Sequence, residues 1–177
     1  ADNEIPLALY KIGCKYYYGI GVIKDEEKAI EYWIKAMDKK CYAVIKMFEI
    51  AAEAGNIEAQ CNLGLIYKKG SINIIDFGKA KYWYQKAADN GHNVAQVNLG
   101  CMYEDGLGGE ECLEKAKHYY QLSADQGNSN AMFNLAILNK NEKDYVKAFE
   151  LFEKSAKLED EDAQYNVGMM YYDGNGV

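Results

Sequence analysis

Few residues in this chain have the types and spacing that catalysis or metal binding requires. The sequence has two histidines, His92 and His118, which are 26 positions apart and fall in different predicted elements. His92 lies in a predicted turn, and His118 takes a place that Glu31 and Tyr82 hold in other segments. Both histidines are therefore predicted to be surface residues, and no catalytic pair or metal ligand set is indicated.

Motifs for nucleotide, phosphate or peptide-bond chemistry are absent from the sequence. It contains no HExxH, GxSxG or GxGxxG motif and no P-loop. The glycines at 19 and 21, and at 106, 108 and 109, are predicted to form turns, because no Lys-Ser or Lys-Thr pair follows them. With four serines and no threonine, the chain also has few hydroxyl nucleophiles. We expect no cofactor and no catalytic residue.

Two short acidic runs, at 110–111 and 160–162, carry oxygen atoms that a cation could bind. Both runs lie at the start of predicted helices, where carboxylates interact favourably with the positive end of the helix dipole. We interpret them as helix-start residues and expect no bound metal.

The five cysteines are predicted to be reduced. They are Cys14, Cys41, Cys61, Cys101 and Cys112. Their number is odd and no CxxC pair occurs, which favours five free thiols and an intracellular environment over a disulfide framework.

The composition argues against a nucleic-acid partner and against a membrane span. The formal net charge is −7 at pH 7, and all 20 basic residues are lysine, so the arginine fork that binds phosphates is missing. A chain of this charge is not expected to bind a nucleic-acid backbone. No stretch approaches the roughly 18 apolar residues of a membrane span.

A repeat of 36 residues organises the chain. Gly55, Gly91 and Gly127 are 36 residues apart, and Ala59, Ala95 and Ala131 keep the same spacing. A fixed period of about 20 to 50 residues is typical of a solenoid, in which stacked units bury one another's apolar faces.

Each repeat is predicted to contain two helices. The first half reads AQCNLGLIY at 59–67 and AQVNLGCMY at 95–103, with small and apolar residues on one helical face. The second half reads KAIEYWIKA at 28–36 and KAKYWYQKA at 79–87. A glycine inside a helix costs about 1 kcal/mol, so the recurrence of Gly64 and Gly100 predicts close approach of a neighbouring helix.

These segments resemble Sel1-like repeats, which are relatives of tetratricopeptide repeats. The shared pattern is Ala, Leu-Gly and Tyr, then Gly-x-Gly-Val, Lys-Ala, paired aromatics and Ala-Ala-x-x-Gly, and it recurs in phase over nearly the whole chain. The resemblance implies an all-α fold, a right-handed α-solenoid of antiparallel helix pairs. It also implies an adaptor or scaffold that binds other proteins.

We predict a single repeat domain over residues 1–177 with ten helices. Residues 1–40 form repeat 1, 41–57 an extra helix similar to a second half, 58–93 repeat 2, 94–129 repeat 3, 130–161 a shortened repeat 4, and 162–177 the start of a further repeat. The extra helix is predicted because Ile12 and Leu63, at equivalent positions, are 51 residues apart instead of 36. We expect the chain to bend or restack there, since this helix lacks a first-half partner.

The tetratricopeptide fold implies that the first-half helices line a concave groove. The predicted partner-binding residues point into it and are Tyr10, Cys14, Tyr17, Cys61, Leu65, Lys68, Val97, Cys101, Glu104, Phe133, Ile137, Lys140, Tyr165, Met169 and Tyr172. The alternative for each single residue is burial against the adjacent first-half helix.

The sequence therefore predicts a non-catalytic protein–protein interaction scaffold. Its partner would present a peptide or an amphipathic helix, and the negative charge favours a basic one. The competing hypothesis is a weak β-lactam-binding or β-lactam-hydrolysing enzyme, which the resemblance brings in because such activity is attributed to some bacterial relatives. The lack of an activated nucleophile favours the scaffold.

The last predicted helix is expected to have an open apolar side. Residues 174–177 match 19–22, which a second-half helix follows at once. Without that helix, Met169, Met170 and Tyr171 would be uncovered, and uncapped solenoid ends tend to associate. We expect that the natural chain continues or that this end packs on another molecule, including a second copy.

Overall fold

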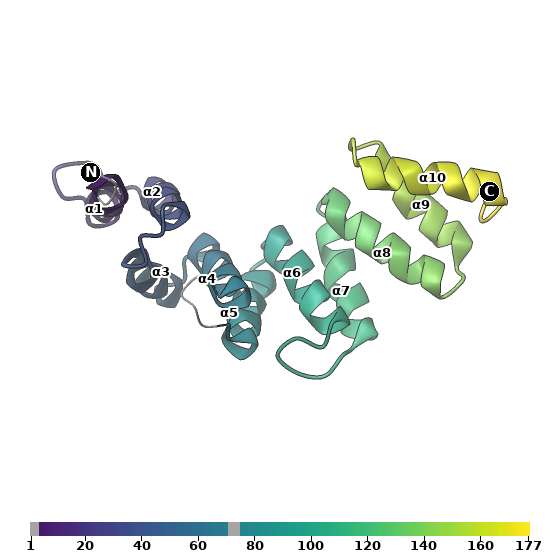
Figure 1. Cartoon of the computed structure of the whole chain (residues 1–177), viewed down its shortest axis with the longest axis horizontal. Coiled ribbons are helices and arrows are strands. Elements are labelled where there is room, and N and C mark those ends of the chain that lie inside the picture. The colour runs from purple at the N-terminus through teal and green to yellow at the C-terminus, as the bar shows by residue number, and fades with distance from the viewer. Residues whose placement is uncertain (1–3, 71–74) are drawn as a thin grey trace. The chain divides into compact units, whose positions relative to one another are not determined.

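The fold is entirely α-helical over the residues that the computed structural model describes, 4–70 and 75–177 (Figure 1). The helices fall into two compact units, Ala1–Lys86 and Ala87–Val177, with the boundary inside α5 (Phe77–Asp89). Unit 1 also contains α1 (Glu4–Tyr18), α2 (Glu26–Asp38), α3 (Val44–Glu53) and α4 (Ile57–Lys69). Unit 2 contains α6 (Asn93–Glu104), α7 (Leu113–Ala124), α8 (Ser129–Asn141), α9 (Tyr145–Ala156) and α10 (Glu161–Asp173). The all-α class and the ten helices in these ranges are as predicted.

First-half helices begin at capping residues that recur with the repeat. The side chains of Asn56, His92, Asn128 and Asp160 each accept a hydrogen bond from the backbone N–H three residues later, at 2.9–3.2 Å. Each bond satisfies one of the amide groups that the first turn of a helix leaves unpaired. The Nδ1 atom of His92 therefore has a structural role, which is to cap α6.

The chain enters these helices through a residue with a left-handed backbone conformation. Gly55, Gly91 and Gly127 have φ values of +96°, +84° and +85°, and only glycine adopts such values without a Cβ penalty. At the fourth equivalent position Glu159 has a φ of +65°. The shortened repeat thus keeps the turn although it lacks the glycine.

Within the helix pairs, an aromatic ring of the second helix lies against a small residue of the first. The buried rings of Tyr84 and Tyr120 face Gly64 and Gly100, where an added Cβ atom would lie 2.6 Å and 2.5 Å from a ring carbon. In unit 2, Phe152 and Ala136 belong to one buried cluster. The prediction that glycine admits a neighbouring helix at short range is confirmed.

The helix α3 follows α2 with no helix in residues 39–43 between them. Its Phe48 ring packs edge-on against Trp33 of α2, with the ring centroids 5.8 Å apart. Both side chains are almost completely buried. The core of unit 1 therefore joins two successive helices through an aromatic contact, in place of the glycine contact of the regular pairs.

A glutamine forms the same hydrogen bond at three helix junctions. Gln60 of α4 donates from Nε2 to the carbonyl oxygen of Ala52 in α3, at 3.0 Å. Gln96 and Gln164 donate to the second-half helices before them, at 3.2 Å and 3.4 Å. The helix α3 is thus joined to α4 as α9 is joined to α10.

All five cysteines are free thiols, as the sequence predicts. Cys61 is buried, and the other four are half-buried.

Candidate partner-binding surface

A groove of 360 Å³ lies between α6 and α8 in unit 2, and we call it the α6–α8 groove. Its lining residues are Val94, Val97 and Asn98 from α6 and Asn128, Asn130 and Asn134 from α8 and its cap. An amide side chain both donates and accepts hydrogen bonds. The groove therefore offers polar partners for a peptide backbone beside two valines for apolar side chains.

Asparagines are the feature of this surface that the sequence analysis missed. Asn62, Asn98, Asn134 and Asn166 recur at intervals of 36, 36 and 32 residues. In α4, α6 and α10 the Nδ2 atom donates to the carbonyl oxygen four residues earlier, at 2.9 Å, which fixes the side chain along its helix. Their spacing matches the repeat, and this is the signal in the sequence that identifies them.

The apolar residues predicted to bind a partner are half-buried in α6 and α8. Val97 and Cys101 pack against one buried cluster of unit 2, and Phe133 and Ile137 pack against another. The ring of Phe133 lies edge-on to the buried ring of Phe152, with the centroids 5.5 Å apart. These side chains contribute to the core, and only part of each is open to a partner.

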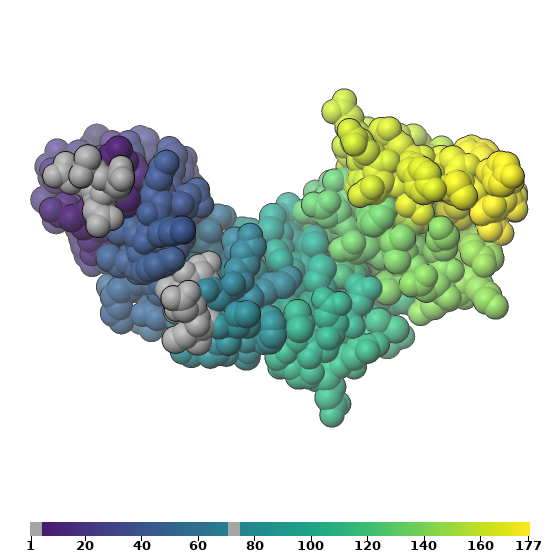
Figure 2. Space-filling model, in the orientation of Figure 1, coloured from purple at the N-terminus to yellow at the C-terminus, as the bar shows by residue number. Residues whose placement is uncertain are grey.

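The predicted residues of α10 are more exposed. Tyr165 and Tyr172 are 69% and 86% exposed, and Figure 2 shows the yellow surface of α10 without other segments over it. Met169 is half-buried. The expectation that Met170 is uncovered is wrong, because it lies seven residues after Ala163 on the same helical face and belongs to the same buried cluster.

Two of the charged residues predicted for this surface, Lys140 and Glu104, have hydrogen-bond partners. Lys140 Nζ donates to Asn166 Oδ1 at 3.2 Å, which links α8 to α10. The hydroxyl of Tyr120 donates to the Glu104 carboxylate at 2.7 Å and lies 3.2 Å from the sulfur of Cys101. Burial, together with the neighbouring Cys101 and Glu104, raises the pKa of Tyr120, so its phenol keeps the proton that it donates.

In unit 1 the predicted residues lie on α1 and α4, which α2 and α3 separate in the chain. They are Tyr10, Cys14 and Tyr17 on α1, all half-buried, and Cys61, Leu65 and Lys68 on α4. The Tyr17 ring packs on Trp33, with the centroids 5.3 Å apart. Cys61 is only 8% exposed and is one of seven buried residues among the 13 residues of α4. The structure therefore places Cys61 in the core and not on an open face.

A comparison with known families identifies the repeats. The Sel1 repeat profile matches residues 6–40, 57–92, 93–128, 129–160 and 161–177. The chain belongs to the Sel1 repeat family. Between the first two matched repeats, residues 41–56 lie outside the matches, and this segment contains α3.

Solved structures of other Sel1-repeat proteins are similar to this one. One is c5321, a protective antigen present in uropathogenic Escherichia coli strains, with a TM-score of 0.71 and 31% identity over 97% of this chain and 34% of that chain. The present chain thus spans about a third of that protein. Another is a Sel1 repeat protein from Oxalobacter formigenes, with a TM-score of 0.69 and 29% identity over 99% of this chain and 67% of that chain. No curated protein sequence matches the chain.

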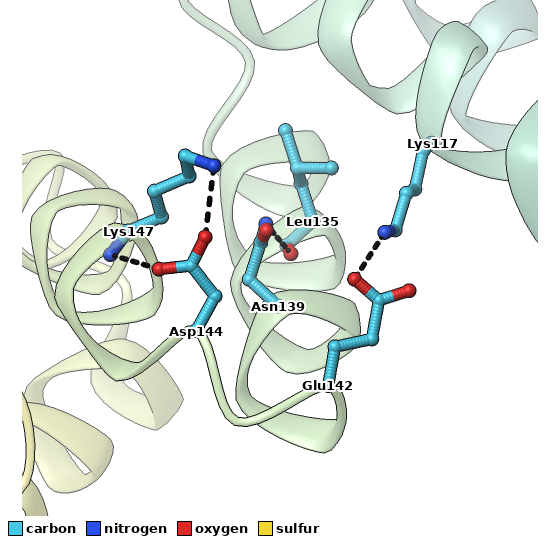
Figure 3. A network of polar contacts seen from close by, with 6 residues as sticks. All are labelled: Lys117, Leu135, Asn139, Glu142, Asp144 and Lys147. Carbon is cyan, nitrogen blue, oxygen red and sulfur yellow. Dashed lines mark hydrogen bonds and ion pairs between the residues drawn. The ribbon is translucent and has the colours of Figure 1, made fainter.

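A second cleft of unit 2, with a volume of 640 Å³, is lined by α7, α8 and α9 of the Sel1 repeats. Figure 3 shows two of its lysines in ion pairs: Lys117 pairs with Glu142, and Lys147 pairs with Asp144 at 2.8 Å. Asp144 also caps α9, and its hydrogen bonds with Lys147 lower its pKa. These contacts hold the turn between α8 and α9 and give the cleft a mixed charge that suits no single class of ion.

Metal and membrane sites are not found in residues 4–70 and 75–177. No group of three or more His, Cys, Asp or Glu side chains there is placed to hold a metal ion. None of the helices described is both long enough and apolar enough to cross a bilayer.

Proposed function

We propose that this chain is a non-catalytic scaffold that holds a segment of a partner protein on the first-half helices of unit 2. Sel1-repeat proteins generally act as protein-interaction scaffolds. The observation that carries the proposal is the α6–α8 groove, where Asn98 and Asn134 line one cavity beside Val94 and Val97. Such amides can donate hydrogen bonds to C=O groups and accept them from N–H groups of an extended backbone, and the valines can contact its side chains.

The surface continues from α8 to α10, which the Lys140–Asn166 hydrogen bond links. Exposed tyrosines are strong interface anchors, because they bury a large area at a small cost in side-chain entropy. Tyr165 and Tyr172 therefore extend the binding surface beyond the groove. With a net charge of −7, the chain should associate faster with a basic segment than with an acidic one.

The proposal predicts that peptides selected from a displayed random library depend on the groove asparagines. We expect Asn98→Ala and Asn134→Ala each to weaken the selected peptide about tenfold, because each removes hydrogen bonds worth about 1 kcal/mol or more at a desolvated contact. Asn141→Ala is the matched control, since Asn141 is an exposed residue of the same helix α8. Affinities are measured by fluorescence anisotropy.

Two outcomes would contradict this function. One is a selected peptide whose affinity survives both groove changes but falls with Lys154→Ala on α9, which would place binding on the second-half helices. The other is hydrolysis of the β-lactam nitrocefin by the purified chain at a rate proportional to its concentration, which would favour the enzyme hypothesis.

We further infer that the open side of α10 pairs with another molecule of the chain. A Cβ atom added to Gly168 has no neighbour within 4 Å, whereas at Gly100 it meets Tyr120. Tyr171 and Tyr172 beside it are 61% and 86% exposed. Tyr172→Ser should shift sedimentation velocity profiles toward the monomer at equal concentration. A wild-type chain that stays monomeric up to about 100 times the concentration of the binding assays would refute this inference.

A further inference from the structure

A cleft in unit 1 between α2 and α4, here the α2–α4 cleft, is separate from the surface proposed above. It consists of two neighbouring cavities of 140 Å³ and 310 Å³, and Ile34 of α2 lines both. The smaller cavity has Phe48 of α3 and Leu65 of α4 in its wall. A hydrogen bond of 3.4 Å between Glu26 and Asn56 ties the start of α2 to the cap of α4.

The cleft lies where the repeat order is broken. In unit 2 the ring of Tyr120 is covered by Gly100 of the first-half helix before it, and Phe152 clusters with Ala136. The equivalent ring on α3 is Phe48, and the helix directly before α3 is α2, a second-half helix. This ring meets Trp33 instead and borders the smaller cavity. One helix of the regular pattern is therefore missing beside this cleft, and the first-half helices of the chain have 12 to 15 residues.

The cleft has an apolar lining and an acidic margin. Its apolar residues are Ile30, Ile34, Met37, Phe48, Leu65 and Ile66. Its charged residues are Glu27, Glu31, Asp38, Glu58 and Lys69, which are four carboxylates and one ammonium group.

We propose that the α2–α4 cleft binds an amphipathic helix of a partner protein that is rich in lysine or arginine. Apolar side chains one turn apart on such a helix would enter the two cavities. Basic residues beside them would face Glu27 and Glu31. A helix of about 14 residues, roughly four turns, matches the length of the helix that the repeat lacks. The proposal rests on the protein-binding role of the chain but uses other residues and the other unit.

The test uses synthetic peptides of about 14 residues and the full chain. One peptide carries leucine on one helical face and lysine on the other, its acidic twin carries glutamate in place of lysine, and a scrambled basic peptide has no apolar face. We expect the basic amphipathic peptide to bind at least about tenfold more tightly than the other two in fluorescence anisotropy at physiological salt.

Charge reversal in the chain locates the site. Glu31→Lys should weaken the basic peptide about tenfold, and Glu53→Lys, an equal change of net charge on an exposed residue outside the cleft, should have less than about twofold effect. Both positions are exposed, and thermal unfolding by circular dichroism checks that both variants fold. If the two variants weakened the basic peptide equally, or if the scrambled peptide bound equally well, binding would be due to general charge attraction. Either result would overturn the proposal.

The result for the α2–α4 cleft can be distinguished from the result for the α6–α8 groove. Peptides bound by that groove should respond to Asn134→Ala and not to Glu31→Lys, and the basic helix should show the reverse pattern. A basic peptide lost on Asn134→Ala would mean that the cleft is not its site. An effect of Glu31→Lys on the sedimentation of the free chain would show that a second copy occupies the cleft, which also overturns the proposal.

Discussion

Gly100→Ala will destabilise unit 2, whereas Gly168→Ala will stabilise it. Alanine favours a helix over glycine by about 1 kcal/mol, and at Gly168 the added methyl group meets no atom within 4 Å. At Gly100 the methyl group would lie 2.5 Å from the buried ring of Tyr120. Overpacking of this kind costs about 1–3 kcal/mol, which exceeds the gain in helix propensity.

Urea unfolding followed by far-ultraviolet circular dichroism measures both changes, at a concentration where the chain is monomeric. Gly64→Ala extends the test to unit 1, because its methyl group would lie 2.6 Å from the Tyr84 ring. Equal stabilisation by all three substitutions would show that the rings move aside at little cost. The close helix contact would then not be the reason for glycine in these helices.

Leu99→Ala should cost about 2–5 kcal/mol of folding free energy, because it leaves a cavity in a fully buried site. Tyr165→Ala, on a side chain that is 69% exposed, should change stability by less than about 0.5 kcal/mol. The same substitution should weaken a peptide selected on unit 2 by about 1–3 kcal/mol. Comparison of Leu99→Ala with Tyr165→Ala thus distinguishes residues that stabilise the fold from residues that bind a partner.

Phe133→Ala is the informative intermediate case. Its ring packs on Phe152 and is only half-buried, so the substitution should lower both stability and affinity. Denaturant unfolding and peptide anisotropy are measured on the same preparations. A Tyr165→Ala variant as unstable as Leu99→Ala, or one that binds as tightly as wild type, would contradict the assignment of α10 to the binding surface.

The helices could be predicted from the sequence because the same local features recur in each repeat. Small and apolar residues recur at helical spacing, and Gly55, Gly91 and Gly127 mark the turns that only glycine enters easily. The break after α2 was also visible, since the distance from Ile12 to Leu63 exceeds the period. These signals are local or strictly periodic, so one sequence is enough to read them.

The binding surface could be predicted only in part, because burial depends on how neighbouring helices pack. Cys61 and Tyr165 hold equivalent positions in their repeats, yet one is 8% and the other 69% exposed. The difference arises because α4 is covered on most sides, whereas α10 has an open face. The asparagines were missed because apolar periodicity gives no weight to polar positions. The α2–α4 cleft is bordered by Phe48, whose ring contacts Trp33, and no local pattern encodes this packing.

The glutamine-to-carbonyl hydrogen bond at three junctions bears on how such chains change length during evolution. It joins a second-half helix to the helix that follows, and it forms between α3 and α4 although α3 has no first-half helix of its own. The junction is therefore independent of the helix pair before it. We therefore expect the loss or gain of a single helix to leave in place those junctions of this kind that do not involve the changed helix. Under the proposed function, each such event would shift the binding surface by one helix and present a partner with a new spacing.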